Sequence, residues 1–173
     1  AQIAEIAALP IQQETIALWK SLNDLHPQRP MALLDEVCWN EMDVDGELTL
    51  GTLDPFCRQI ETDLRRRLYT WRHMRADMVM EAVVSIPKAI TGTEFGMPVD
   101  EQLAATDPAN EIVSHRYHDQ LRNEADLQRF LFPDARLDEA ETEHRETLAH
   151  EIFDGILEVE MKGLEPAFDA WDW

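Results

Sequence analysis

The sequence predicts a mixed α/β fold in which helices alternate with short strands. Helical segments with recognisable start signals or apolar periodicity occur at residues 12–25, 54–71 and 138–153. Short apolar runs rich in Val, Ile and Met lie between them. The last of these helices is followed directly by a glycine and then by an alternating segment, which is the chain order of an α/β unit.

Composition narrows the classes of protein that this chain can belong to. Its 173 residues are enough for one ordinary domain. It has 15 Lys and Arg against 35 Asp and Glu, a net charge of −20, which argues against nucleic-acid and anionic-membrane partners. The start lacks the features of a signal peptide, so we expect a cytoplasmic protein. Cys38 and Cys57 are too few for a disulfide framework and are expected to be buried free thiols.

The first half of the chain contains two predicted helices separated by a strand and a turn region. The helix over 12–25 carries apolar residues near helical spacing and stops before Pro27, because the residue before proline avoids the helical region. The short apolar run 31–39 predicts a strand that becomes a loop, and 40–54 is rich in turn-forming residues. Asp54 then predicts a helix N-cap, with Pro55 at the first helical position.

This second helix has an apolar stripe and a basic face. The stripe consists of Phe56, Ile60, Leu64, Leu68 and Trp71. The opposite face carries Arg58, Arg65, Arg66, Arg67, Arg72 and Arg75, and six arginines minus Glu61 and Asp63 leave a local charge of +4. Arg65, Arg66 and Arg67 are therefore candidates for a face that binds an anion or a partner. The other interpretation is that they pair with the protein's own excess acids.

The second half is predicted to hold three strands and two helices. Residues 77–90 predict a buried strand, 91–110 a loop, and 112–118 a short strand. A short helix is expected from Asn123 or Glu124 to Leu131. Asp138 and Glu141 have capping-box spacing and open the helix to 153, whose inward residues are expected to be Leu137, His144, Leu148 and Ile152. Gly155 is the expected C-terminal cap, and 156–161 the last strand, with no sheet partner after it.

No pattern in the chain predicts a complete metal site. In the stretch E-M-D-V-D-G-E-L-T, Glu41, Asp43, Asp45 and Gly46 fit positions 1, 3, 5 and 6 of a calcium loop, but position 12 is Thr52 instead of a carboxylate. We therefore expect an acidic turn, with a calcium response as a minor hypothesis. His115 and His118 lie on a predicted strand, where a spacing of three places them on opposite faces.

Several segments together resemble a known family. They are LWKSLND, RPMALLDEVCWNEM, DPFCRQIETDLRRRLYTWRHMRADMVMEAVVSIPKAI, YHDQLRNEADLQRFLFPD and LDEAETEHRETLAHEIFDGILEVEMKG. From about Glu14 to Gly163 the chain resembles the N-terminal portion of uroporphyrinogen decarboxylase-like proteins, in the branch related to corrinoid-dependent methyltransferases. The resemblance implies an N-terminal extension plus the first strand or strands of a TIM-barrel-type protein, truncated here. It implies one domain over 1–173, with a sub-boundary near 110 and an approach to the barrel over 111–173.

The departures from the family qualify what the resemblance implies about activity. The decarboxylase proper has an arginine-rich substrate motif where this chain has ALLDEVCWNEM, with carboxylates and no arginine. The methyltransferase branch holds zinc with His-x-Cys and a distant Cys, and no such triplet occurs here. The resemblance therefore implies no catalytic residue and no cofactor in this chain, while zinc, a corrinoid and a corrinoid protein are expected for a full-length protein.

Two functional hypotheses follow. The first is an N-terminal enzyme region, inactive alone, that supplies substrate-pocket or subunit contacts through Trp39, Glu41 and His118, which follow or end predicted strands. The second is a stand-alone acidic binding module that docks a partner through its arginine-rich helix face. The terminal Trp171 and Trp173 leave apolar surface with nothing downstream to cover it, so we expect a piece of a longer protein and a homo-oligomer.

Overall fold

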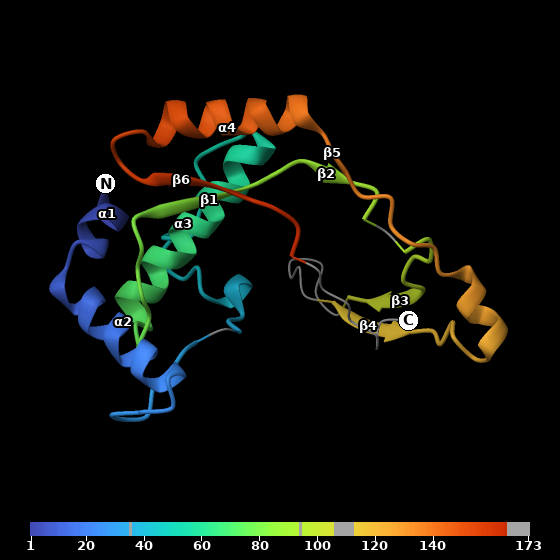
Figure 1. The fold of residues 1–173 in the computed structure, drawn as a ribbon, viewed down its shortest axis with the longest axis horizontal. Coiled ribbons are helices and arrows are strands. Elements are labelled where there is room, and N and C mark those ends of the chain that lie inside the picture. The colour runs from blue at the N-terminus through green and yellow to red at the C-terminus, as the bar shows by residue number, and fades with distance from the viewer. Residues whose placement is uncertain (35, 94, 106–112, 166–173) are drawn as a thin grey trace. The chain divides into compact units, whose positions relative to one another are not determined.

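The structure is a computed structural model that describes residues 1–34, 36–93, 95–105 and 113–165. It is mixed α/β, as the sequence predicts (Figure 1). Its strands form small two-stranded sheets. The chain divides into two compact units. Unit 1 comprises Ala1–Ser85 and Ala149–Glu160, and unit 2 comprises Ile86–Leu148 and the residues from Met161 onward. The sub-boundary expected near 110, like Trp171 and Trp173, lies outside the described residues.

Unit 1 begins with two helices, α1 (Gln2–Ala7) and α2 (Pro10–Asn23). The short α1 was not predicted, and α2 begins two residues before the predicted start because Pro10 occupies its first turn. The strand predicted over 31–39 is wrong, since its described residues form coil and a short 3₁₀ helix, η1 (Trp39–Glu41). Ala32 instead exchanges hydrogen bonds with Asp77, donating its N–H to the carboxylate at 2.8 Å and accepting the Asp77 N–H at 3.0 Å.

The long helix α3 (Pro55–His73) confirms the predicted start signal. The Asp54 carboxylate accepts the backbone N–H of Cys57 at 3.0 Å, and Pro55 occupies the first turn. Ile60 of the predicted apolar stripe is buried, and the other four stripe residues are half-buried. This stripe anchors α3 in unit 1. The polar side chains of α3 beside the stripe contact the loop that precedes the helix.

The predicted strand over 77–90 is shorter in the structure. β1 (Val83–Pro87) pairs with β6 (Glu158–Lys162), which is the strand predicted over 156–161. The last strand therefore has a sheet partner, which precedes it in the chain. Val84 and Ile86 of β1 are fully buried, as is Met80 in the segment before it. Burial of this apolar run agrees with the sequence, although only part of it forms a ladder.

Unit 2 contains two further small antiparallel sheets. β2 (Ile90–Thr91) pairs with β5 (Arg136–Leu137), and β3 (Glu101–Ala104) pairs with β4 (Ser114–Tyr117). β4 falls within the predicted strand 112–118, whereas β3 falls in the predicted loop 91–110. The predicted helix after Asn123 is the 3₁₀ helix η2 (Glu124–Arg129), which opens with a capping box between Asn123 and Asp126.

Helix α4 (Glu139–Phe153) has the predicted ends but a different buried face. Its start is capped by Asp138, whose carboxylate accepts the Glu141 N–H at 3.0 Å, and Gly155 follows with a φ of +75°. The expected inward residue His144 is exposed, and so are Leu137 and Ile152. The buried residues of the helix are Thr142, Ala149 and Phe153, and the Thr142 hydroxyl accepts the backbone N–H of Ala89 at 3.0 Å. Among the described residues, no helix has the length and apolar character needed to cross a membrane.

Candidate functional site

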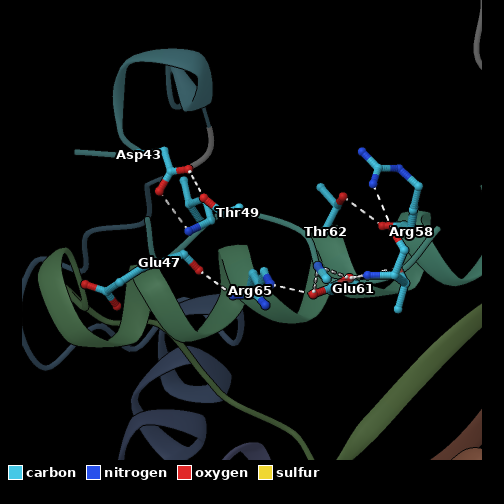
Figure 2. Close-up of polar contacts among 10 residues, drawn as sticks. Asp43, Glu47, Thr49, Arg58, Glu61, Thr62 and Arg65 are labelled. Carbon is cyan, nitrogen blue, oxygen red and sulfur yellow. Dashed lines mark hydrogen bonds and ion pairs between the residues drawn. The ribbon is translucent and has the colours of Figure 1, made fainter. Parts of the chain in front are cut away.

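The arginine-rich side of α3 is covered by the loop that precedes it. We call the loop residues 39–54, together with the α3 side chains that hold them, the loop–helix clasp. Figure 2 shows its polar contacts, which run from Asp43 in the loop to Arg58 on the helix. All of its residues belong to unit 1. The clasp includes Arg65, one of the residues that the sequence proposed as candidates.

Glu61 is the centre of the clasp. Its carboxylate accepts the backbone N–H groups of Gly51 and Thr52, each at 2.9 Å, and the Thr52 hydroxyl at 2.7 Å. It also accepts Nε of Arg65 at 2.8 Å (Figure 2). The backbone donor of Gly51, followed by those of Thr52 and then Arg65, lowers the pKa of Glu61 to about 2. Glu61 therefore fixes the loop as an ionised carboxylate and is not poised to act as a general acid.

Two arginines reinforce this contact from the helix. Arg65 donates a second hydrogen bond, from Nη1 to the backbone carbonyl of Glu47 at 2.8 Å. Arg58 donates to the carbonyl of Thr52 at 2.9 Å. Both side chains therefore bind the chain's own loop, as expected for guanidinium groups whose forked donors match oxygen acceptors.

The last turn of α3 holds the middle of the loop. The two carboxylate oxygens of Glu47 lie 2.5 Å from Nη1 of Arg72 and 2.7 Å from Nε2 of His73. Arg72, and after it His73, lowers the pKa of Glu47. Arg72 also donates from Nη2 to the side-chain oxygen of Gln2 at 2.9 Å, which ties α1 to the same end of α3.

Trp39 and Glu41 lie on η1, at the start of the clasp. The Arg66 guanidinium stacks over the Trp39 ring, 5.1 Å from its centroid, and Tyr69 meets that ring edge-on at 6.0 Å. Trp39 is half-buried by these contacts, and Glu41 on the same turn is exposed. The structure thus brings two of the three predicted substrate-binding residues together on one anchored turn.

The third predicted residue, His118, belongs to unit 2. It follows β4. Its ring Nδ1 lies 3.1 Å from a carboxylate oxygen of Asp100, and its backbone N–H donates to the Asp100 backbone carbonyl at 2.8 Å. On the same hairpin, His115 Nδ1 lies 2.6 Å from a carboxylate oxygen of Glu101. Each histidine is therefore paired with an acid from the opposite strand, and His118 does not share a unit with Trp39 and Glu41.

The three consecutive arginines do not form one continuous face. Successive helix residues point about 100° apart, so each side chain meets a different neighbour. Arg65 reaches the loop and Arg66 covers Trp39. Arg67 donates to the carbonyls of Val83 and Glu81 at 2.8 and 2.7 Å, which ties α3 to β1 and the segment before it. Of the triplet, Arg66 is exposed to solvent, whereas Arg65 and Arg67 are half-buried.

The acidic turn around Asp43 is held by hydrogen bonds within the loop. The Asp43 carboxylate accepts the Leu48 N–H and the Thr49 hydroxyl, both at 3.0 Å, and Gly46 adopts a φ of +76° (Figure 2). Within residues 1–34, 36–93, 95–105 and 113–165, no group of three or more His, Cys, Asp or Glu side chains could hold a metal ion. Both cysteines are free, but Cys38 is exposed and Cys57 is half-buried, so the expectation that both are buried is wrong.

The sequence did not reveal a hollow that lies beside the clasp. It has a volume of about 330 Å³ and is lined by Gln2, Glu47, Glu61, Leu64, Arg65, Leu68 and Arg72. The α3 residues in this lining repeat at helical spacing, which was the available signal. The loop and α1 residues could not be assigned to it from the sequence, because only the folded chain brings them to α3.

Comparisons with family models, with curated protein sequences and with solved structures return no match to this chain.

Proposed function

We propose that this chain is the N-terminal region of a uroporphyrinogen decarboxylase-like enzyme, in the branch related to corrinoid-dependent methyltransferases. In this proposal it is inactive alone and contributes a substrate-pocket wall or a subunit contact. The observation that carries the proposal is the η1 turn, on which the exposed Glu41 follows a tryptophan that Arg66 and Tyr69 hold against α3.

An anchored turn of this kind suits a binding wall. Functional side chains act best when their position is fixed before the ligand arrives, because ordering them on binding costs free energy. The packing of Trp39 and the hydrogen bonds of the clasp restrain both ends of the loop on which Glu41 lies. Glu41 can then offer a carboxylate, and Trp39 an aromatic edge, to a substrate carried by the rest of the enzyme.

The arrangement of β1, α4 and β6 agrees with the barrel part of the proposal. α4 leads through Gly155 into β6, and β6 lies beside β1 in one sheet. A strand followed by a helix and a neighbouring strand is the repeating unit of a TIM barrel, and here β2 to β5 and η2 lie between β1 and α4 in the chain. In the proposal, β6 is an early barrel strand, and zinc and a corrinoid are bound by the full-length protein, outside these 173 residues.

Titration of the chain with zinc and with cobalamin tests the claim that it is inactive alone. Isothermal titration calorimetry should detect no stoichiometric binding of either, since the sequence holds no His-x-Cys pair. Binding of one equivalent of zinc or cobalamin would contradict the proposal.

The pocket wall is tested in the full-length enzyme. Replacing Glu41 with Gln should lower kcat/KM by about tenfold or more, because the exposed carboxylate contacts substrate. Asp45→Asn is the matched control, since Asp45 is another exposed acid of the same loop. Equal effects of the two substitutions would show that Glu41 has no specific role.

The stand-alone binding module remains a second candidate, and the exposed Arg66 favours it. Because Arg65 and Arg67 donate to the chain's own carbonyls, Arg66 is the member of the triplet that a partner would reach first. In this case Arg66→Ala should abolish binding of an immobilised polyglutamate peptide while the chain stays folded, with only the small loss of stability expected from the lost stacking on Trp39. Undiminished binding would exclude docking through this residue.

A further inference from the structure

Charged and apolar side chains of α3 alternate along the hollow beside the loop–helix clasp. Glu61, Arg65, Leu68 and Arg72 follow one another along α3 at the i, i+4, i+7 and i+11 positions, which share one side of a helix. Leu64, next to Arg65 in the chain, also lines the hollow. Along the helix, the hollow therefore presents a cationic group, an apolar patch and a second cationic group.

The Glu61 carboxylate in the hollow is already occupied, whereas arginine donors remain. The Glu61 carboxylate accepts Gly51, both donors of Thr52 and Arg65, which fills the roughly four lone-pair positions of a carboxylate. A guanidinium carries about five N–H donors. Among the described residues, Arg65 uses two of these donors on protein acceptors, and so does Arg72.

This imbalance favours a ligand that brings acceptors. A carboxylate beside each guanidinium would receive the remaining N–H groups in the forked geometry that arginine prefers. The charge of Glu47 does not prevent this, because its two oxygens are held by Arg72 and His73. The charge of Glu61 is offset in the same way by the backbone donors of the loop.

The spacing of the two arginines sets the length of the ligand. Arg65 and Arg72 are seven residues apart, which is a rise of about 10.5 Å along the helix. Leu68 lies between them and offers methyl groups to an apolar spacer, and Leu64 lines the same hollow just before Arg65. A volume of about 330 Å³ accommodates a small molecule of this length.

We propose that this hollow binds a linear aliphatic dicarboxylate of about six carbons, with one carboxylate at Arg65, the other at Arg72, and the methylene chain on Leu68. This site is separate from the exposed turn of Trp39 and Glu41, so it does not depend on the enzyme proposal above.

The test is binding of adipate to the chain, followed by the backbone amide signals of residues 47–72 in two-dimensional NMR. Hexanoate has the same chain with one carboxylate, and 1,6-diaminohexane has the opposite charge. Adipate should shift these signals in a saturable way, hexanoate should bind about tenfold or more weakly, and the diamine should not bind. No saturable shift with adipate up to about 10 mM, or equal affinity for hexanoate, would overturn the proposal.

Variants locate the site. Arg72→Gln should weaken adipate binding by about tenfold or more, whereas the matched control Arg75→Gln, which removes the same charge from a residue outside the lining, should change it less than about twofold. Arg72→Lys keeps the charge and should still weaken binding, because lysine lacks the forked donor. If both Arg72 variants unfold, Leu68→Asn provides a further test. It should lower the affinity for adipate more than the affinity for acetate. Equal loss in the Arg72 and Arg75 variants, or unchanged binding in Leu68→Asn, would overturn the assignment.

Discussion

Thr52 donates both its backbone N–H and its hydroxyl to one carboxylate oxygen of Glu61, at 2.9 and 2.7 Å. The two residues are nine positions apart, and the contact closes the turn that leads from the loop into α3. Hydrogen bonds to an ionised acceptor are shorter and stronger than those between neutral groups. This contact holds Thr52 of the loop against α3.

Replacing Glu61 with Gln should lower the stability of the protein. The amide offers one oxygen, and its NH₂ group would face the donors of Gly51 and Thr52, which would leave those donors unsatisfied. The denaturation midpoint in urea should fall. Asp63→Asn is the control, because Asp63 is exposed and only reaches Arg67 at 3.7 Å. Equal midpoints for the two variants would contradict this role of Glu61.

The stability should also depend on pH in the acid range. The pKa of Glu61 in the folded state is about 2, and that of Asp77 is also about 2, the latter lowered first by its hydrogen bonds from Arg29 and then by that from Ala32. Because both folded-state values lie below the ordinary values of 4.5 and 3.8, the unfolded state binds more protons as pH falls. Both contributions are therefore present above about pH 5 and are lost progressively as pH falls toward about 2.

Urea denaturation at a series of pH values measures this effect. The loss of stability between pH 5 and pH 2 should be smaller in the double variant Glu61→Gln, Asp77→Asn than in the unmodified chain. An identical pH dependence in the two proteins would show that other carboxylates dominate.

Arg67 should prove more important for stability than its neighbour Arg66. Arg67→Met removes the donors to the Val83 and Glu81 carbonyls and should cost about 1–3 kcal/mol in the free energy of unfolding. Arg66→Met loses only the stacking on Trp39 and should cost about 0.5–1 kcal/mol. Chemical denaturation of both variants provides the comparison. A larger cost at Arg66 would mean that the clasp depends on its aromatic contact.

Two glycines offer a matched test of backbone crowding. Gly92 and Gly155 have φ angles of +70° and +75°, so alanine is strained at either position. A Cβ at Gly92 would lie 2.3 Å from the carbonyl oxygen of Asp134, whereas at Gly155 it would meet nothing within 4 Å. Gly155→Ala should cost about 1 kcal/mol and Gly92→Ala should cost more. Equal melting temperatures for the two variants would contradict the close approach at Gly92.

Sequence patterns predicted the elements whose signals are local. Asp54 and Pro55 define the start of α3, Asp138 that of α4 and Gly155 its end, because capping depends on residues within one turn. The strand expected over 31–39 failed because Ala32 is bonded to Asp77, a contact between residues 45 positions apart. The buried side of α4 was misplaced because a polar residue, Thr142, turns inward to bond Ala89.

The candidate site was predictable only in part. The sequence identified Trp39, Glu41 and the arginine triplet by their chemistry. It did not identify their partners, since Arg65 and Arg67 bind backbone carbonyls, which every residue carries and no side-chain pattern marks. It also grouped His118 with Trp39 and Glu41, whereas the fold places His118 in a different unit.

The central claim is that this chain is the N-terminal region of a larger barrel enzyme. The most direct measurement is the intact mass of the natural polypeptide, captured from its source with an antibody against this chain. We expect a polypeptide well above 20.0 kDa, extended by a substantial part of a barrel of about 250 residues and containing His-x-Cys with a later Cys. A natural polypeptide of 20.0 kDa would contradict the claim and leave the stand-alone binding module.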